Sequence, residues 1–283
     1  MATNTQATPV WFITGCSTGL GRALAERVLK HGHRVVATAR DPKQIQDIVS
    51  GSANALGLQL DVTDAKQVSE TVAQTERTFG RIDVLVNNAG VYGPMGPIDD
   101  VAWAEWEQAV RVNLFGSVLC CRAVLPHFRA NGYGKIIQLS GGGATSPLPR
   151  LSAYAASKAA VVRFAETLAE ELRDTGIDVN AVAPGALNTR LLDEVIEAGP
   201  RRVGDSFYQR ALEQQATGGT PLDLPTRLVV FLASSASDGI SGKLISAPWD
   251  PWEELPSHAD DLRETDVYTL RRIVPADRGL SWG

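Results

Sequence analysis

The feature that most constrains the fold is a regular alternation of short apolar runs with segments of helical spacing. Strands that are apolar on both faces belong to parallel sheets covered by helices on both sides. The predicted strands are residues 10–14, 34–39, 55–60, 82–88, 134–140, 177–184 and 242–247. The predicted helices include residues 20–30, 64–79, 103–130 (with a bend near Pro126) and 152–174. The sequence therefore predicts an α/β fold with a doubly wound parallel sheet of about seven strands.

Neither a repeat nor a linker divides the chain, so residues 1–283 are predicted to form one domain with its core at 10–247. Two segments fit the alternating pattern less well. Residues 187–222 are mixed and polar, and we expect them to form a lid over a site. Residues 248–283 form a C-terminal extension that carries Trp249 and Trp252. We expect this extension to dock, either on the core or as a lid or subunit contact.

A glycine-rich turn, TGCSTGLG, links the first predicted strand to the first helix. Glycine lets the chain turn sharply and bring backbone N–H groups close to an anion, and the helix N-terminus adds partial positive charge. A tight turn without a ligand is the alternative, but its place after the first strand of an α/β chain favours a nucleotide site. The predicted contacts are Gly15, Ser17, Thr18, Gly19, Leu20 and Gly21.

The residues after the second predicted strand indicate which dinucleotide would bind. An acid at this place accepts a hydrogen bond from the ribose 2′-hydroxyl of NAD. Here Ala39 and Arg40 stand instead, and a guanidinium can hold the 2′-phosphate of NADP with two parallel hydrogen bonds. NADP(H) is therefore favoured over NAD(H). In the other interpretation Arg40 is a solvated loop residue and Asp41 caps a helix that begins at Pro42.

With TGCSTGLG at 14–21, NNAG at 87–90, Asn113 and YAASK at 154–158, the chain resembles the short-chain dehydrogenase/reductase family over about residues 10–247. The resemblance implies a Rossmann-type single domain, a nicotinamide cofactor, a small alcohol or carbonyl substrate, and a homodimer or homotetramer. It also implies roles for individual residues. Asp61 and Val62 would contact the adenine, and Asn87, Ala89 and Gly90 would line the cofactor. The catalytic set would hold Asn113, Tyr154 and Lys158, and the nicotinamide carboxamide would meet Pro184, Gly185 and Thr189.

Tyr154 and Lys158 are four residues apart on a predicted helix, so they share one face. A free phenol has a pKa near 10 and is a poor base at neutral pH. A nearby ammonium and the positive charge of an oxidised nicotinamide both favour the phenolate, and we expect them to lower the pKa by about 2–3 units. Tyr154 would then take a proton from an alcohol or give one to a carbonyl.

The serine that the family carries 13 residues before its tyrosine is replaced here by Gly141. Ser140 is adjacent and Ser146 lies in the following loop, and the glycines at 141–143 give the backbone freedom to bring either in. Three alternatives stay open. One of these serines polarises the substrate oxygen, or a water or substrate hydroxyl fills the space, or the redox step is crippled and the fold reused. We favour a working enzyme with Ser140 or Ser146 as the donor.

Composition narrows the class of protein. The net charge is −5 without a long basic run, which argues against nucleic acid and anionic membrane as partners. No apolar run reaches membrane-spanning length, and the polar start, MATNTQATP, does not resemble a signal peptide. The cysteines, Cys16, Cys120 and Cys121, are odd in number, which suits a reducing compartment, so we expect a cytoplasmic protein. The four histidines show no metal-ligand spacing.

These observations predict an NADP(H)-dependent oxidoreductase that interconverts an alcohol and a carbonyl, with Tyr154 as the acid/base. The alternative is a protein of the same fold that binds the cofactor for non-redox work, such as epimerase or lyase chemistry or ligand sensing. The missing serine keeps that alternative open.

Overall fold

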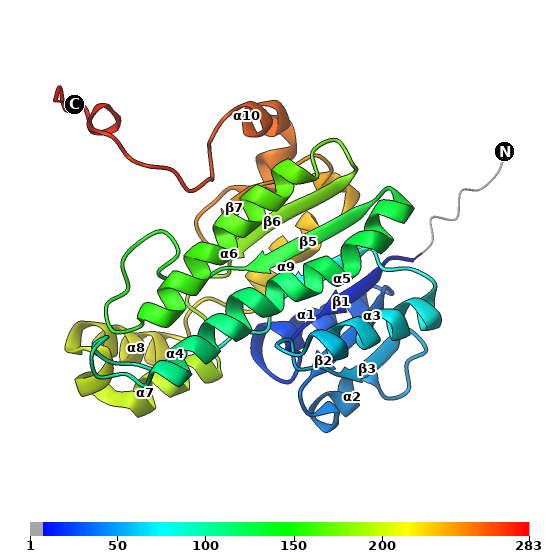
Figure 1. Cartoon of the computed structure of the whole chain (residues 1–283), viewed down its shortest axis with the longest axis horizontal. Helices are drawn as coiled ribbons and strands as arrows, with labels where there is room; N and C mark the ends of the chain where they lie inside the picture. The colour runs from blue at the N-terminus through cyan, green and yellow to red at the C-terminus, as the bar shows by residue number, and fades with distance from the viewer. Residues whose placement is uncertain (1–7, 283) are drawn as a thin grey trace.

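The computed structural model describes residues 8–282, and its centre is a sheet of seven parallel strands (Figure 1). The strand order is β3-β2-β1-β4-β5-β6-β7, and every neighbouring pair is parallel. The strands are β1 Val10–Ile13, β2 Arg34–Ala39, β3 Ala55–Gln59, β4 Val84–Asn87, β5 Gly134–Leu139, β6 Ile177–Ala183 and β7 Leu244–Ser246. This confirms the predicted doubly wound sheet of Rossmann type. The first seven residues of the polar start lie outside the described residues.

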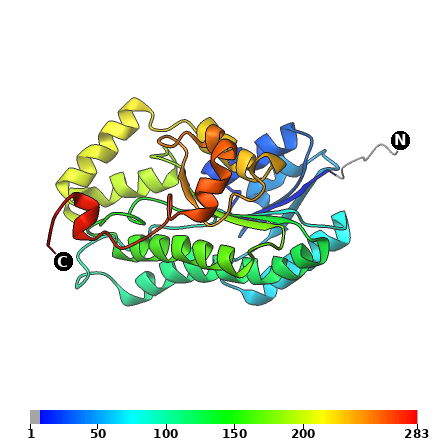
Figure 2. The ribbon, with the colours of Figure 1, turned by 90° about the horizontal axis from the view of Figure 1, so that it is seen from above.

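Helices cover both faces of the sheet, as Figure 2 shows from above. One layer holds α3 Ala65–Phe79, α4 Trp103–Val110, α5 Gly116–Asn131 and α6 Ser152–Glu171. The other holds α1 Gly19–Lys30, α9 Asp223–Leu232 and α10 Ala259–Glu264. The short α2 Gln46–Val49 and the helix α9 were not predicted from the sequence.

The two layers enclose two apolar cores, one on each face of the sheet. Successive side chains on a strand point to opposite faces, so Trp11 and Ile13 enter one core while Phe12 enters the other. Burial of β1 on both faces is what its unbroken apolar sequence predicted. The cores hold the strands rigidly in register, and the carboxyl ends of the strands carry the loops that form the site.

The long helical stretch Trp103–Asn131 is interrupted at a different place from the one predicted. Its departure from α-helical geometry is a π-helical turn at Arg111–Phe115, and α5 continues through Pro126. A π-helical turn adds a residue to one turn of helix and is often found at functional sites. Here it contains Asn113, a residue of the predicted catalytic set.

By length and composition alone, Trp103–Asn131 is long and apolar enough to cross a membrane, which corrects the prediction that no apolar run reaches that length. Helices that cover the sheet of a globular protein pass the same test. In this structure Cys120, Val124 and Phe128 of the stretch are buried in the core beneath the sheet. The stretch is therefore weak evidence for a membrane partner.

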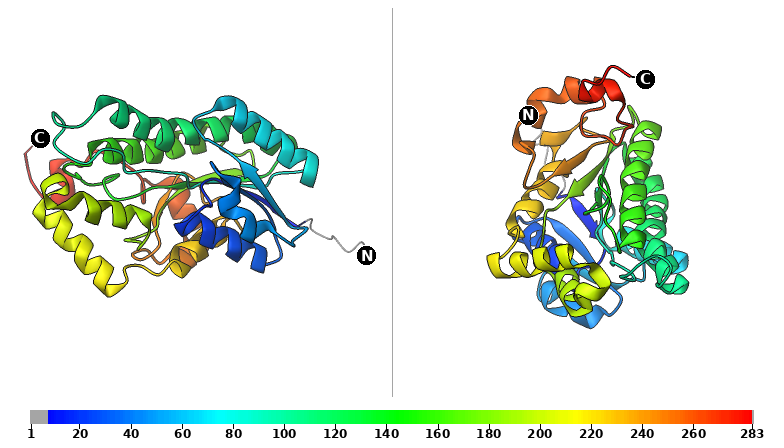
Figure 3. Two further views of the ribbon diagram at one scale, coloured as in Figure 1. Left: turned by 90° about the horizontal axis from the view of Figure 1, so that it is seen from below. Right: turned by 90° about the vertical axis from the view of Figure 1, so that its left-hand side faces the viewer.

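The predicted lid segment folds into two helices, α7 Arg190–Val203 and α8 Asp205–Thr217. Figure 3 shows them together at one end of the molecule. Their shared apolar contacts form a small third core around Leu192, Val195, Val203 and Ala211. This local core explains how a segment of mixed sequence folds outside the two main layers.

The C-terminal extension docks on the body of the protein over its first part. Trp252 and Leu262 are buried in the core beside α9, whereas Trp249 is 84% exposed. The backbone N–H of Leu244 on the edge strand β7 donates to the carbonyl oxygen of Tyr268 at 2.8 Å. Beyond Leu270 the chain leaves the body of the molecule (Figure 1).

Candidate active site

The glycine-rich turn packs directly against the loop after β4. A Cβ placed on Gly21 would lie 2.3 Å from Asn88 Nδ2, so no other residue fits there without a shift. The Asn88 side chain donates from Nδ2 to the carbonyl oxygens of Thr14 and Gly15, both at 2.9 Å. These bonds fix the turn in front of the first turn of α1.

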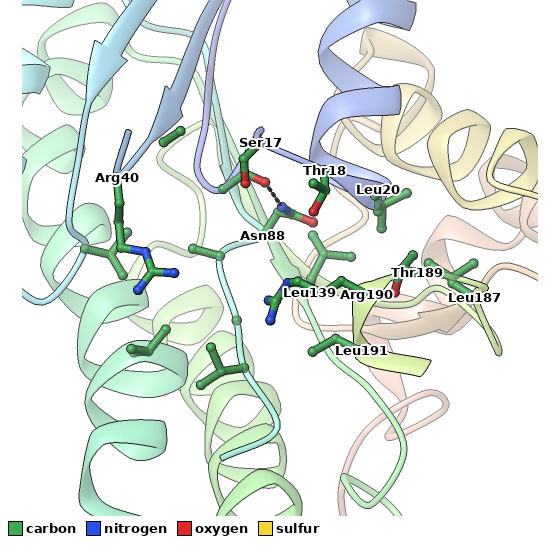
Figure 4. Close-up of a pocket in the computed structure, with 18 of the residues that line it drawn as sticks. Ser17, Thr18, Leu20, Arg40, Asn88, Leu139, Leu187, Thr189, Arg190 and Leu191 are labelled. Atoms are coloured by element: carbon green, nitrogen blue, oxygen red, sulfur yellow. Dashed lines mark hydrogen bonds between the residues drawn. The ribbon is translucent and has the colours of Figure 1, made fainter. Parts of the chain in front are cut away.

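The N-terminus of α1 opens into the pocket. Thr18 is its N-cap residue, and among the described residues its side chain makes no capping hydrogen bond. The backbone N–H groups of the first turn are thus left for a ligand, as at anion-binding helix termini. The pocket is lined here by Gly15, Ser17, Thr18, Gly19 and Leu20 (Figure 4). This cradle fits the diphosphate of a dinucleotide.

Three residues of the predicted cofactor set, Gly21, Asn87 and Gly185, do not line this pocket. Gly21 packs behind the turn, and Asn87 is buried, donating from Nδ2 to Ser117 O and Cys121 Sγ at 3.4 Å each. The neighbouring Asn88 lines the pocket instead. At the end of a strand, adjacent side chains point to opposite sides, so the motif identified the segment but not the residue that faces the pocket.

The ends of β2 and β3 form the far side of the pocket. Arg40 is exposed and lines the pocket, and Figure 4 shows its guanidinium at the side opposite the lid. Asp41 Oδ1 accepts from Lys43 N at 3.0 Å, so the carboxylate caps the turn after β2, as the other interpretation of this loop expected. Asp61 and Val62 also line the pocket, and Asp61 Oδ1 accepts from Thr63 N and Oγ1 at 2.9 and 2.7 Å.

Tyr154 and Lys158 project from one face of α6 into the same pocket. Lys158 Nζ donates to Leu139 O at 2.7 Å and lies 5.7 Å from the centre of the Tyr154 ring. Burial lowers the pKa of Lys158 to about 8. The lysine is thereby held at one place beside the tyrosine.

In this structure the pKa of Tyr154 lies above its ordinary value, and the lowering expected from an ammonium together with an oxidised nicotinamide stays a prediction for the cofactor complex. Burial raises this pKa, and the neighbouring Tyr92 raises it further. The rings of the two tyrosines meet edge to face, with centroids 4.6 Å apart. Desolvation penalises the phenolate, so Tyr154 carries its proton at neutral pH.

Gly141 lies directly against the hydroxyl of Tyr154. A Cβ placed on Gly141 would stand 2.1 Å from Tyr154 Oη and 2.9 Å from Tyr154 Cζ. The space that a larger residue would take at this position is therefore filled by the tyrosine oxygen itself. The glycine is a requirement of this arrangement of Tyr154.

The structure separates the two serines that were candidates for the donor. Ser140 is 4% exposed and lines the pocket, and within the described chain its Oγ has no hydrogen-bond partner. A buried hydroxyl without a partner is costly, and functional sites are where such groups occur. Ser146 is exposed and lies outside the pocket lining.

Asn113 is buried behind the pocket and does not line it. Its Oδ1 accepts from Val91 N, and its Nδ2 donates to Val91 O and to Ser157 Oγ, all at 2.9 Å. Ser157 lies between Tyr154 and Lys158 on α6. Asn113 therefore ties the loop after β4 to the helix that carries the tyrosine.

The loop after β6 and the start of α7 close the remaining side. Pro184 and Thr189 line the pocket, whereas Gly185 packs elsewhere, because a Cβ on it would lie 2.5 Å from Thr220 Oγ1. Ala89 and Gly90 line the pocket as expected from NNAG. The sequence did not identify ten further lining residues: Ala39, Leu60, Asn88, Val91, Gln108, Val112, Leu139, Leu187, Arg190 and Leu191.

The family model for short chain dehydrogenases matches residues 9–199. Oxidoreductase BOA17 of Botryotinia fuckeliana is 41% identical over 184 residues, 64% of this chain and 67% of the relative. Short-chain reductase protein NovJ of Streptomyces niveus is 35% identical over 244 residues, 83% of this chain and 91% of the relative.

Two solved structures share the fold. An actinorhodin polyketide ketoreductase with NADPH has a TM-score of 0.77 at 28% identity, covering 87% of this chain and 97% of that chain. The 3-ketoacyl-(acyl-carrier-protein) reductase of Brucella melitensis, complexed with NADH, has a TM-score of 0.74 at 29% identity, covering 84% and 96%. With the family model covering more than half of the sequence, the chain belongs to the short-chain dehydrogenase family and is an NAD(P)-dependent oxidoreductase.

Proposed function

We propose that the protein is an NADP(H)-dependent oxidoreductase that interconverts a carbonyl compound and its alcohol, with Tyr154 as the acid/base. The observation that carries this proposal is that Tyr154, Lys158 and Ser140 line one pocket together with the N-terminus of α1. The anion cradle and the proton donor thus face the same space. The names of relatives such as NovJ and the actinorhodin ketoreductase agree with reduction of a carbonyl.

Each polar group has a separate part in the reaction. The nicotinamide cofactor, when bound, supplies the hydride to the carbonyl carbon. Tyr154, which carries its proton at neutral pH, gives the proton from Oη to the carbonyl oxygen. Ser140 Oγ donates a hydrogen bond to that oxygen, and Lys158 stabilises the phenolate left on Tyr154. In the reverse direction Tyr154 takes the alcohol proton.

The experiment follows absorbance of the reduced cofactor with a panel of aliphatic, aromatic and polycyclic ketones, with NADPH and NADH in parallel. The proposal expects turnover with at least one ketone and a higher kcat/KM with NADPH. Tight cofactor binding without turnover of any carbonyl or alcohol would instead favour a non-redox role.

The preference for NADP(H) is supported by Arg40 at the end of β2. Arg40→Ala is expected to weaken NADPH binding by about 1.5–3 kcal/mol, the range of hydrogen bonds to charged groups, and to leave NADH binding nearly unchanged. Lys43→Ala is the matched control, because Lys43 is an exposed cation on the same loop outside the pocket lining. Equal affinity of the parent protein for NADPH and NADH would contradict the preference.

We propose that α7 and α8 act as the lid, since Leu187 and Leu191 line the pocket from that side.

We propose a homodimer or homotetramer, for which the exposed apolar side chains of Trp103 and Phe115, 68% and 50% exposed, supply a contact surface. The free, buried cysteines agree with a cytoplasmic protein. Size-exclusion chromatography with light scattering on Phe115→Asp tests the assembly.

A further inference from the structure

The first residue of α7 brings a cation to the phosphate cradle. Arg190 lines the same pocket as Ser17, Thr18 and Gly19. Thr189, its neighbour, has its Cγ2 3.2 Å from the place of a Cβ on Gly19. The N-terminus of α7 therefore lies directly against the N-terminus of α1. Figure 4 shows the Arg190 side chain extending from the lid side into the pocket.

Within residues 8–282, three basic side chains line this pocket: Arg40, Lys158 and Arg190. Arg40 stands at the opposite side, at the end of β2 (Figure 4). Lys158 is buried and donates to Leu139 O beside Tyr154. Arg190 is the remaining cation, and it lies beside the turn that fits a diphosphate. A guanidinium is well suited to that partner, since it forms parallel hydrogen bonds to phosphate oxygens.

Arg190 can exchange its present ion-pair partner, Glu194, for a ligand. Arg190 forms an ion pair with Glu194, one turn further along α7, and the arginine side chain is 51% exposed. Pairs of this kind between exposed side chains on one helix contribute little to stability, about 0.3–0.5 kcal/mol. A diphosphate in the cradle carries more negative charge than one carboxylate and would compete effectively for the guanidinium.

We propose that Arg190 binds the diphosphate of the nicotinamide cofactor, leaving Glu194 to do so, and thereby fixes the first turn of α7 over the bound cofactor. The inference rests on dinucleotide binding alone. It is independent of the preference for NADP(H) and of the redox step. This contact would also hold α7 and α8 closed over the cofactor before the substrate is bound.

The first test measures affinity by titration calorimetry with NADPH, NADH, ADP-ribose and adenosine 2′-monophosphate. Arg190→Ala is expected to weaken the three ligands that contain a diphosphate by about tenfold, the scale of one charge-assisted contact at a half-exposed site. Adenosine 2′-monophosphate should bind as before. Arg40→Ala should give a different pattern, weakening NADPH and adenosine 2′-monophosphate and sparing NADH and ADP-ribose. Arg201→Ala, an exposed arginine on the same helix outside the pocket lining, is the control.

The second test separates ligand binding from helix stabilisation. Glu194→Gln releases Arg190 from its competitor, so affinity for ADP-ribose should rise, by up to about fivefold. If the pair only stabilises α7, Arg190→Ala and Glu194→Gln should change affinity in the same direction. Unchanged ADP-ribose binding in Arg190→Ala, or weaker binding in Glu194→Gln, would overturn the proposal. Failure of the parent to bind any dinucleotide would count against the oxidoreductase assignment itself.

Discussion

Gly141 lies directly against the hydroxyl of Tyr154, so any side chain at this position would meet the tyrosine oxygen. A Cβ at 141 would lie 2.1 Å from Tyr154 Oη, well inside van der Waals contact. The tyrosine reaches that place while its ring rests against the edge of Tyr92. The donor that a serine would have supplied is replaced, in our account, by Ser140, whose Oγ is buried at the pocket.

We therefore predict that a serine at position 141 lowers the rate of catalysis. Gly141→Ser and Gly141→Ala should each lower kcat by about 10–100-fold, because either Cβ displaces the Tyr154 oxygen by a distance that matters for catalysis. Gly142→Ala is the control, because a Cβ there has no neighbour within 4 Å. A Gly141→Ser variant with a higher kcat than the parent would contradict this prediction and show that the glycine impairs catalysis.

Ser140 and Ser146 are told apart by single alanine substitutions. Ser140→Ala is expected to lower kcat by about 10²-fold, the cost of one donor to a developing oxyanion. Ser146→Ala should leave kcat unchanged, since Ser146 is exposed and outside the pocket lining. If both variants and their combination match the parent, a water or the substrate itself supplies the hydrogen bond.

The lowered pKa of Lys158 makes the free energy of unfolding depend on pH. Its pKa is about 8 in the folded protein and 10.5 ordinarily, so between these values the unfolded chain binds more protons. The free energy of unfolding of the parent, relative to Lys158→Met, should therefore rise with pH from about 8 to 10.5. Urea denaturation of both proteins across this range measures the difference. A flat or falling difference would contradict the lowered pKa.

Among the elements, the π-helical turn Arg111–Phe115 has the most specific consequence for the site. It belongs to the stretch between α4 and α5 and contains Asn113, whose amide binds both backbone groups of Val91 and the hydroxyl of Ser157. Three elements are joined at this one side chain: the loop after β4, the π-helical turn and α6. Asn113 is thus a positioning residue in this structure.

Asn113→Ala is expected to lower the free energy of unfolding by about 2–4 kcal/mol, because it leaves the partly buried N–H and carbonyl of Val91 without partners and removes one of the two hydrogen bonds at Ser157 Oγ. It should also lower kcat, since α6 carries Tyr154. Asn180→Ala is the matched control: Asn180 is buried and bonds Ile240 O and Lys243 N at 2.7 and 3.1 Å, away from the pocket. Equal loss of kcat at equal loss of stability in both variants would refute the positioning role.

The sequence predicted the elements that are defined by local pattern. Unbroken apolar runs such as VWFI of β1 predicted strands buried on both faces, and the predicted helix at 64–79 begins at Asp64, whose carboxylate accepts from Lys66 N and Gln67 N. No local pattern in the sequence predicts the π-helical turn. The raised pKa of Tyr154 and the positions of Asn88 and Gly141 were not predicted, because burial and packing between distant segments decide them.

At the scale of the whole molecule, the site is a product of the parallel sheet. The loops after β1 to β6 all open at one edge, so residues from Gly15 to Thr189 meet in one pocket. The two cores support that edge from both faces of the sheet, while α7 and α8 share a small core of their own.

The most direct test of the account is the Tyr154→Phe variant, assayed for both cofactor binding and turnover. We predict that NADPH binds to this variant with the parent's affinity, because the phenylalanine ring keeps the packing against Tyr92. The rate of carbonyl reduction should fall at least about 10²-fold, because the proton donor is absent. A Tyr154→Phe protein that reduces the same carbonyl at the parent's rate would contradict the central claim that Tyr154 transfers the proton.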